Sequence, residues 1–520
     1  MKAFLLSRDR DFDLQEALPA QAEVLTQDLE LNTLFNAMAC GDTVLFDVAQ
    51  KAILSGLSDL DTVLYRQDIL RDCLNNSSIV RDIYDIAVAS IEREKTGYWS
   101  LLRDFPDTIL HRSIEVLQMF VGALKELRNI ADEHADQFQS EGFTVFFAML
   151  KRELGDEYFA TVQKHLRQLK FRDGVLISAE LGEGNKGINY TLRKPHDRKE
   201  NWIERILEER PRSYTFHLHP RDENGAKALS ELNDRGINLV ANALAQSTDH
   251  ILSFFSMLRT ELAFYVGCLN LDAKLEQKGA PMSFPLPVAS SERRHSFAGL
   301  YDICLALSLE QKIVSNEVNA DNKDLVFITG ANQGGKSTFL RGIGVAQLMM
   351  QSGMFVPAES FCANVCEGIF THYRREEDTT MKSGKFDEEL SRMSGVVDHL
   401  KANSMLLFSE SFAATNDREG SEIARQIVSA LLEKRIKVFF VTHLYEFAHG
   451  FYDKTMPNAI FLRAERQVDG MRTFKLMEGE PLQTSYGEDL YDRIFIEAAV
   501  CKGSSAVGSP PSAQVGRSFV

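Results

Sequence analysis

The chain has 520 residues, which is too long for one hydrophobic core, so two to four domains are expected. Its hydrophobic share of 44% and charged share of 25% are those of ordinary globular proteins, and the net charge of −16 argues against a surface coated with basic residues for nucleic acid. No apolar run approaches the roughly 20 residues that cross a bilayer, so no membrane partner is expected.

The first part of the chain predicts a helical scaffold. After a lead-in of residues 1–25, apolar residues in the stretch 26–170 recur at spacings of three and four, as they do on one face of a packed helix. The clearest case is 59–74, and long helices are expected at about 111–138 and 142–168. This scaffold forms the first part of a helical core and lever.

The pattern changes at 171–220, where a small β insert is predicted. Residues 174–180 and 188–193 are apolar or alternating, and a glycine-rich turn at 181–187 separates them. Residues 213–218 are a candidate further strand.

Helical periodicity returns at 221–290 as the second part of the core and lever. From Asp324 onward, short apolar strands alternate with helices, so 291–500 is expected to be an α/β domain. The last residues, 501–520, are mostly small residues and proline with little charge, which predicts a disordered tail.

The seven cysteines are scattered along the chain. The closest pair, Cys362 and Cys366, has no second pair to complete a zinc site. Reduced thiols and a cytoplasmic location are therefore expected.

One segment carries a specific phosphate-binding pattern. A buried strand at 325–329 runs into GANQGGKS (330–337), which fits G-x-x-x-x-G-K-[ST], and a helix follows at 338–350. Backbone amides of such a loop surround the phosphates, Lys336 reaches the β and γ oxygens, and the Ser337 hydroxyl binds Mg²⁺. The predicted cofactors are ATP and Mg²⁺, and the predicted nucleotide-binding residues are Gly330, Ala331, Asn332, Gln333, Gly334, Gly335, Lys336, Ser337 and Thr338.

A P-loop ATPase needs a second strand that ends in acidic residues, for the metal and for the attacking water. The strand 405–408 is such a candidate, but it ends in Ser409 and Glu410 rather than Asp-Glu. Glu410 keeps the catalytic position, whereas Ser409 can hold a metal-bound water without supplying charge. The alternative is that Glu410 is an ordinary surface carboxylate after a strand.

A third strand, 438–441, is followed by Thr442 and His443. In a doubly wound sheet these side chains lie beside the P-loop strand, where His443 can sense the terminal phosphate. A purely structural histidine is the alternative, and it is the more common role of a lone histidine, so the residues alone favour it.

Together these segments resemble the MutS family of DNA mismatch-repair ATPases. The resemblance rests on FITGANQGGKST (327–338), GMFVPAE (353–359), SGKFDEELSRM (383–393), SESFAATNDREG (409–420), VTH (441–443) and TSYG (484–487). It extends more thinly to Arg66-Gln-Asp68, which resembles a motif of the family's helical core. The implied fold is multidomain: an all-α core and lever domain with a small β insert, then an α/β P-loop ATPase domain of the ABC type.

The resemblance also implies partners and further site residues. Two ATPase domains of a homodimer face each other, so Ser383 and Gly384 of one chain complete the nucleotide site of the other. Ile313 stands where the repair enzymes often stack an aromatic side chain on adenine. The chain begins almost at the core, without the mismatch-reading domain, and the β insert occupies the position of the DNA clamp.

Whether DNA is a partner stays open at this point. Residues 164–212 hold twelve Lys and Arg against eight Asp and Glu, which suits a modest phosphate-contacting patch in an acidic chain. A solvated surface of mixed charge explains the same composition. The expected function is ATP-driven conformational change on structured or branched DNA in repair or recombination, and the alternative is an ATP-gated regulatory or assembly protein with a protein partner.

Overall fold

The computed structural model describes residues 1–96, 105–171, 174–193, 217–375, 384–467 and 471–483. Two compact units emerge from the packing of the chain: residues 1–12 with 71–266, and residues 13–70 with 267–520. These divisions differ from the boundaries expected from sequence, which remain predictions. The candidate strand at 213–218 lies mostly outside the described residues, and the tail at 501–520 lies wholly outside them.

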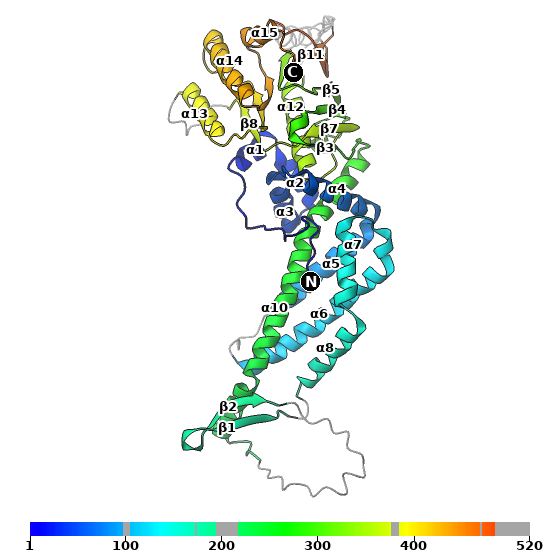
Figure 1. Ribbon diagram of the computed structural model, residues 1–520, viewed down its shortest axis with the longest axis vertical. Helices are drawn as coiled ribbons and strands as arrows, with labels where there is room; N and C mark the ends of the chain where they lie inside the picture. Colours follow the sequence, from blue (N-terminus) through cyan, green and yellow to red (C-terminus); the bar gives the residue numbers. More distant parts are fainter. Residues whose placement is uncertain (97–104, 172–173, 194–216, 376–383, 468–470, 484–520) are drawn as a thin grey trace, which may run out of the picture. The chain divides into compact units, whose positions relative to one another are not determined.

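The unit built from 1–12 and 71–266 is mainly helical, which confirms the predicted scaffold (Figure 1). Its elements are the C-terminal end of α4 (Leu60–Asn75), α5 (Ser77–Thr96), α6 (Pro106–His134), the short η1 (Ala135–Gln137), α7 (Glu141–Glu153), α8 (Asp156–Gln168) and most of α10 (Glu223–Gln277). The single helix expected at 142–168 is wrong, because the chain leaves helical geometry at Leu154 and Gly155 takes an extended conformation as the N-cap of α8.

Buried carboxylates fix the loops of this helical unit. The Asp72 carboxylate accepts hydrogen bonds from the backbone N–H groups of Gln139 and Ser140, which precede α7. Glu261 is fully buried and accepts from the backbone N–H groups of Leu5 and Leu6, so it ties the first residues of the chain to α10. Burial raises the pKa of Glu261 to about 7.

The predicted β insert is present as a two-stranded antiparallel sheet. Strand β1 (Ile177–Leu181) pairs with β2 (Gly187–Leu192), and the short η2 (Glu183–Asn185) lies in the turn between them. Gly184 has a φ of 68°, which a glycine adopts without steric cost.

Helix α10 bears on the expectation that no segment is apolar enough to cross a bilayer. Over part of its 55 residues it is long and apolar enough to cross a membrane, judged by length and composition only. The core helix of a globular protein meets the same criteria, and 67% of that stretch is buried within the protein. The apolar surface of α10 is thus explained by packing.

The other unit holds a six-stranded sheet in the order β12-β11-β6-β10-β9-β8. All neighbours are parallel except the β11–β12 pair. The strands are β6 (Leu325–Gly330), β8 (Ile369–Tyr373), β9 (Met405–Ser409), β10 (Lys437–Val441), β11 (Ala459–Arg466) and β12 (Arg472–Glu478). This confirms the predicted α/β domain.

Helices cover both faces of this sheet (Figure 1). On one face, Phe327, Phe408 and Phe440 are buried in one cluster with residues of α14 (Asp417–Glu433) and α15 (Tyr445–Tyr452). On the other, α12 (Lys336–Gln351) packs so closely that a Cβ on Gly344 would lie 2.7 Å from the Leu407 side chain. The carboxyl ends of the parallel strands are left open between these layers, where ligands of such sheets bind.

A second sheet of four strands lies in the same unit, in the order β3-β7-β4-β5. The strands are β3 (Leu286–Val288), β4 (His295–Leu300), β5 (Asn316–Asn319) and β7 (Ser360–Asn364), with the short η3 (Ser290–Glu292). Among the described residues, the remaining helices are α1 (Ala22–Asp28), α2 (Leu31–Ala39), α3 (Thr43–Leu54), α11 (Ile303–Ser308) and α13 (Lys385–Val397).

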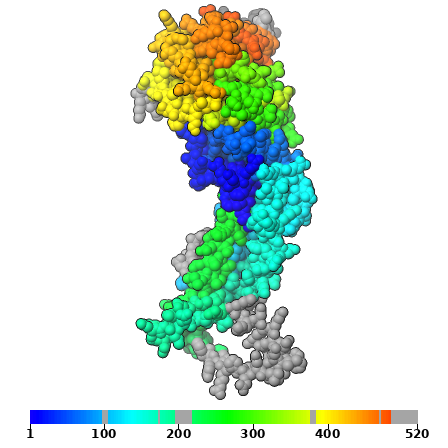
Figure 2. All heavy atoms as spheres, in the orientation of Figure 1, coloured from blue at the N-terminus to red at the C-terminus, as the bar shows by residue number. Residues whose placement is uncertain are grey.

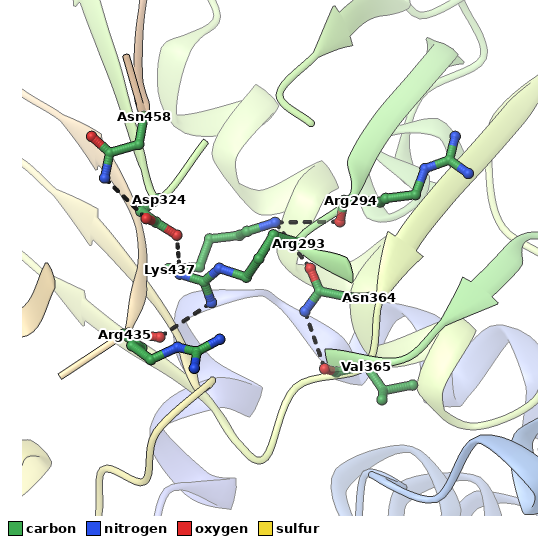
Figure 3. A network of polar contacts seen from close by, with 8 residues as sticks. All are labelled: Arg293, Arg294, Asp324, Asn364, Val365, Arg435, Lys437 and Asn458. Carbon is green, nitrogen blue, oxygen red and sulfur yellow. Dashed lines mark hydrogen bonds and ion pairs between the residues drawn. The ribbon is translucent and has the colours of Figure 1, made fainter. Parts of the chain in front are cut away.

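A buried polar network links the two sheets (Figure 3). Lys437 of β10 is 1% exposed, and its Nζ donates to Asn364 Oδ1 at 3.0 Å and to the Arg294 carbonyl at 3.3 Å. Burial lowers the pKa of Lys437 to about 8. Beside it, Arg293 and Asn458 both hold the Asp324 carboxylate. Lys437, Arg293 and Asp324 each therefore have a hydrogen-bonding partner in this network.

His295 is the exception in this interface, and it allows a test of stability. Its ring is 1% exposed among Phe297, Phe361 and Phe439, and neither ring nitrogen has a hydrogen-bonding partner among the described residues. Burial, with Lys437 nearby, lowers the pKa of His295 well below its usual value. The folded chain therefore keeps this ring neutral at pH values where the unfolded chain protonates it.

His295→Phe is expected to raise the free energy of unfolding by about 1–3 kcal/mol at pH 7, because it removes an unpaired buried polar group. Below about pH 6.5, His295 costs the wild type up to about 1.4 kcal/mol per pH unit, and the variant should lose that part of the slope. Urea unfolding at pH 5 and pH 7 measures both effects. The exposed His111→Phe serves as the control, and an unchanged slope in His295→Phe would contradict the expectation.

Candidate nucleotide-binding site

The segment 330–335 forms a tight loop between β6 and α12. Gly330 and Gly335 have φ values of 106° and 86°, in the left-handed region that favours glycine. At Gly334 the constraint is space, because a Cβ would lie 2.7 Å from the Ala464 side chain and 2.9 Å from the Ala331 carbonyl oxygen. The three glycines thus let the loop curl tightly at the N-terminus of α12, where backbone N–H groups attract anions.

Lys336 points back into the cradle of this loop. It is 5% exposed, and its Nζ donates to the carbonyl oxygens of Gly330 at 3.0 Å and Ala331 at 2.9 Å. Burial lowers its pKa to about 8, although the charge of Glu410 opposes that shift. Among the described residues, the hydrogen-bonding partners of this ammonium are neutral carbonyls. An anionic ligand bound beside it would stabilise its protonated, charged form.

The serines predicted to serve the metal come together. Ser337 Oγ of α12 lies 3.4 Å from Ser409 Oγ at the end of β9. No group of three or more His, Cys, Asp or Glu side chains suited to a metal occurs in the described part of the chain. A Mg²⁺ ion here would therefore depend on hydroxyls, water and the oxygens of its nucleotide.

Glu410 follows Ser409 with a φ of 55°, a conformation that non-glycine residues rarely adopt. Its Oε1 lies 3.1 Å from His443 Nε2, and its Oε2 lies 3.8 Å from an Arg374 nitrogen. The hydrogen bond to His443 is the largest of several effects that lower the pKa of Glu410, so its carboxyl stays ionised. The predicted base and the predicted sensor are thus direct neighbours.

A cavity of about 410 Å³ adjoins the P-loop. Its wall includes the predicted Ile313 as well as Gln333, Gly335 and Thr338 of the loop and helix. Phe474 of β12, 48% exposed, lines the same cavity and had not been singled out from the sequence. The structure therefore offers an aliphatic and an aromatic side chain around one pocket of a size that suits a nucleoside.

Of the two residues expected to act in trans, only Gly384 lies among the described residues. Gly384 is the N-cap of α13, a Cβ there would meet nothing within 4 Å, and it does not line the cavity. Ser383 lies outside the described residues.

Sequence reasoning also missed two arginines that support the site. Arg374 follows β8 and pairs with Glu410, while the Nε of Arg472 donates to the Asn332 carbonyl at 2.7 Å and so braces the P-loop. Arg374 lies just after β8 and Arg472 at the start of β12. This position at the end of a strand was the only feature in the sequence that could have indicated them, because neither has a fixed spacing from the P-loop.

Comparison with known families agrees with this geometry. Residues 58–278 match the model of the MutS2 N-terminal domain, and residues 326–507 match MutS domain V. Domain V is an ATPase domain, and it contains β6, the P-loop, Ser409, Glu410 and His443.

Similar curated proteins carry related names. Over 293 residues the chain is 29% identical to "MutS protein homolog 4" of Homo sapiens, a match that covers 53% of the chain and 30% of that protein. It is 26% identical over 309 residues to "DNA mismatch repair protein MutS" of Prochlorococcus marinus (strain MIT 9301), with 57% and 33% covered. It is 31% identical over 209 residues to a protein of the same name from Thermotoga maritima, with 39% and 26% covered. The chain thus spans about a third of the length of these relatives.

Proposed function

Because the chain belongs to the MutS family, with a MutS2 N-terminal domain and a domain V ATPase, we propose that it binds and hydrolyses ATP with Mg²⁺ and couples this cycle to conformational change in a homodimer on DNA. One observation carries the ATPase part. Lys336, the Ser337–Ser409 hydroxyl pair and the Glu410–His443 pair all lie where the carboxyl ends of neighbouring parallel strands meet.

The residues present fit ATP with Mg²⁺. Lys336, whose Nζ now donates to two backbone carbonyls, would hold the β and γ phosphates, and the Ser337 hydroxyl would hold the cation. The cation neutralises the phosphate charge when bound. The adenine ring of ATP would lie in the cavity between Ile313 and Phe474.

Glu410 performs the proton transfer in this proposal. Its carboxylate accepts a proton from the attacking water, and its lowered pKa keeps it ready to do so at neutral pH. His443 and Arg374 hold its two oxygens, so they orient the base rather than react. Because Ser409 brings no carboxylate to the metal, we expect weak Mg²⁺ affinity and slow turnover.

Ser409→Asp tests this departure. Ser409 Oγ lies 3.4 Å from Ser337 Oγ, so a carboxylate at position 409 should lower the Mg²⁺ concentration at half-maximal ATPase rate at least about tenfold, because one charged contact contributes about 1.5–3 kcal/mol. Without Mg²⁺ the new acid repels Glu410, so the melting temperature of the apo protein should fall slightly.

A Mg²⁺ titration of the ATPase rate decides this prediction. Ser394→Asp, an exposed change on α13, adds the same charge away from the site and is the matched control. If Ser409→Asp needs as much Mg²⁺ as the wild type, Ser409 does not serve the metal.

The homodimer is proposed on the resemblance of Ser383 and Gly384 to a signature that acts in trans. The unobstructed space around Gly384 supports a role at a surface that meets another chain. In this proposal ATP closes the two ATPase domains on each other, so nucleotide binding selects one of two states of the chain.

DNA binding is proposed for the insert region. Arg193, at the end of β2, is exposed, while Lys194, Arg198 and Lys199 lie outside the described residues. Replacing these four residues with Ala should lower DNA affinity and flatten its salt dependence. Each lost phosphate contact removes about 0.9 from the slope of log K against log salt, so the slope should fall by about 2–4.

Gel shifts with branched, mismatched and single-stranded DNA over a salt series measure this effect. The control replaces four exposed basic residues elsewhere with Ala, namely Arg152, Lys401, Arg418 and Lys434. An unchanged slope in the insert variant moves DNA contacts elsewhere. If the wild type binds none of these DNAs, the second candidate function, an ATP-gated protein with a protein partner, replaces the DNA role.

A further inference from the structure

A separate cavity of about 210 Å³ lies among α1, β8 and α13. Its walls come from residues 20–24, from 370–375 and from 392–399, all within one compact unit. In Figure 2 the blue N-terminal helices lie directly against the yellow segment that holds α13. None of its lining residues lines the nucleotide cavity beside the P-loop.

The lining of this cavity is cationic. Arg375 and Arg392 are joined there by His372, His399 and the amide of Gln21, and among the described residues no carboxylate lines the cavity. Carboxylates outside the lining compensate part of this charge: Asp28 pairs with Arg375 at 3.8 Å, and Glu389, Asp28 and Glu388 attract Arg392. In a chain of net charge −16, such a lining is a local reversal of sign.

The two arginines are held close to each other with spare hydrogen-bonding capacity. The Nε of Arg375 is buried and has no hydrogen-bonding partner among the described residues. Arg392 donates from Nη1 to the Tyr373 carbonyl at 3.1 Å, and burial together with the charge of Arg375 lowers its pKa. The positive charges of the two guanidinium groups repel each other in this partly buried cavity. A bound anion would offset that repulsion and stabilise both groups.

The histidines differ in role. Both ring nitrogens of His372 are used, one with the Ser411 hydroxyl at 2.8 Å and one with the Glu389 carbonyl at 3.1 Å. His372 is therefore held in place as part of the cavity wall. Ser411 follows Glu410 directly, so this wall adjoins the segment that carries the proposed base. His399 is exposed and uses its Nδ1 with the Gly395 carbonyl at 2.9 Å, which leaves Nε2 for a ligand.

We propose that this cavity binds a small anion carrying a phosphate group, held by the guanidinium groups of Arg375 and Arg392. Guanidinium groups match the oxygens of phosphate with paired, charge-assisted hydrogen bonds. The cavity exceeds by far the roughly 10–15 Å³ that one water needs, so it accepts a phosphate group with its remaining hydration. The site is independent of the proposed ATPase function.

Equilibrium dialysis of labelled inorganic phosphate against the full chain tests this site. Mg²⁺ and a non-hydrolysable ATP analogue are added to occupy the P-loop, so that only phosphate held elsewhere is counted. We expect one phosphate per chain. Its affinity should fall at least tenfold in Arg392→Gln and in the double variant Asp28→Asn/Arg375→Gln, which neutralises both members of the Asp28–Arg375 pair.

Arg425→Gln, on the exposed face of α14, is the matched control and should bind phosphate as the wild type does. His399→Gln alters only an exposed side chain, so it can be tested even if the arginine variants fail to fold. Its affinity for phosphate is expected to fall about threefold. If glycerol phosphate displaces the labelled phosphate with equal or higher affinity, the ligand is a phosphomonoester. If it does not displace it, the ligand is free phosphate. Absence of bound phosphate when the analogue is present, or equal affinity in all variants, overturns the proposal.

Discussion

Glu410→Gln is expected to lower kcat for ATP hydrolysis at least about 100-fold while ATP stays bound, because an amide cannot accept the proton of the attacking water. The geometry around the side chain should survive, since an amide still bonds to His443 and stays near Arg374. In the wild type, the lowered pKa of Glu410 keeps the base ionised, so the rate should not fall between roughly pH 6 and pH 8 for lack of base.

Single-turnover hydrolysis measures this loss, and light scattering with ATP and Mg²⁺ should show the variant held as a closed dimer. Glu433→Gln, at the exposed end of α14, removes the same charge away from the site and should leave kcat unchanged. Hydrolysis by Glu410→Gln at the wild-type rate would show that Glu410 is not the base.

Lys336→Ala should weaken ATP binding at least about 100-fold, which corresponds to about 2.7 kcal/mol. Lys336 is the only charged side chain in the loop 330–337, and its ammonium lies in the cradle itself. Stability should not suffer, because burial already disfavours the charged form of Lys336 in the apo protein. We therefore expect kcat/KM to collapse with an unchanged or slightly higher melting temperature.

Lys434→Ala, an exposed change after α14, is the control for this prediction. A variant at Lys336 that melts much earlier than the wild type would point to a structural role for its contacts with the Gly330 and Ala331 carbonyls. Unchanged kcat/KM in Lys336→Ala would remove the P-loop from the account.

The parts of the site that the sequence predicted are those encoded by contiguous residues. The loop 330–337 needs glycine where φ is positive and where a Cβ would strike Ala464, so its pattern survives in the sequence. Glu410 and His443 could be placed because Glu410 directly follows one buried parallel strand and His443 lies two residues after the next strand of the sheet. The strands then bring them within 3.1 Å of each other.

The missed residues reach the site through tertiary packing. Phe474 lies on an antiparallel edge strand, and its place beside Gly335 follows from the β11–β12 pairing, which no local pattern encodes. The cavity of Arg375 and Arg392 joins α1 to segments about 350 residues away. Composition could not reveal this cationic lining, because its charges come from separate segments.

The packing partners of residues 13–70 also cannot be read from local pattern. These residues lie in the same compact unit as the P-loop, where the Leu57 N–H donates to the Gln351 carbonyl and the Gln67 side chain donates to the Pro285 carbonyl. Periodicity assigns such helices to a scaffold but does not say which core they join. The break at Gly155 is different, because a glycine between two apolar periods was available as a signal.

Equilibrium binding of a labelled, non-hydrolysable ATP analogue in Mg²⁺ measures whether the loop 330–337 holds nucleotide. We expect one saturable site per chain, whose affinity falls at least about 100-fold in Lys336→Ala and is kept in Glu410→Gln. No saturable binding by the wild type, or equal affinity in Lys336→Ala, would contradict it.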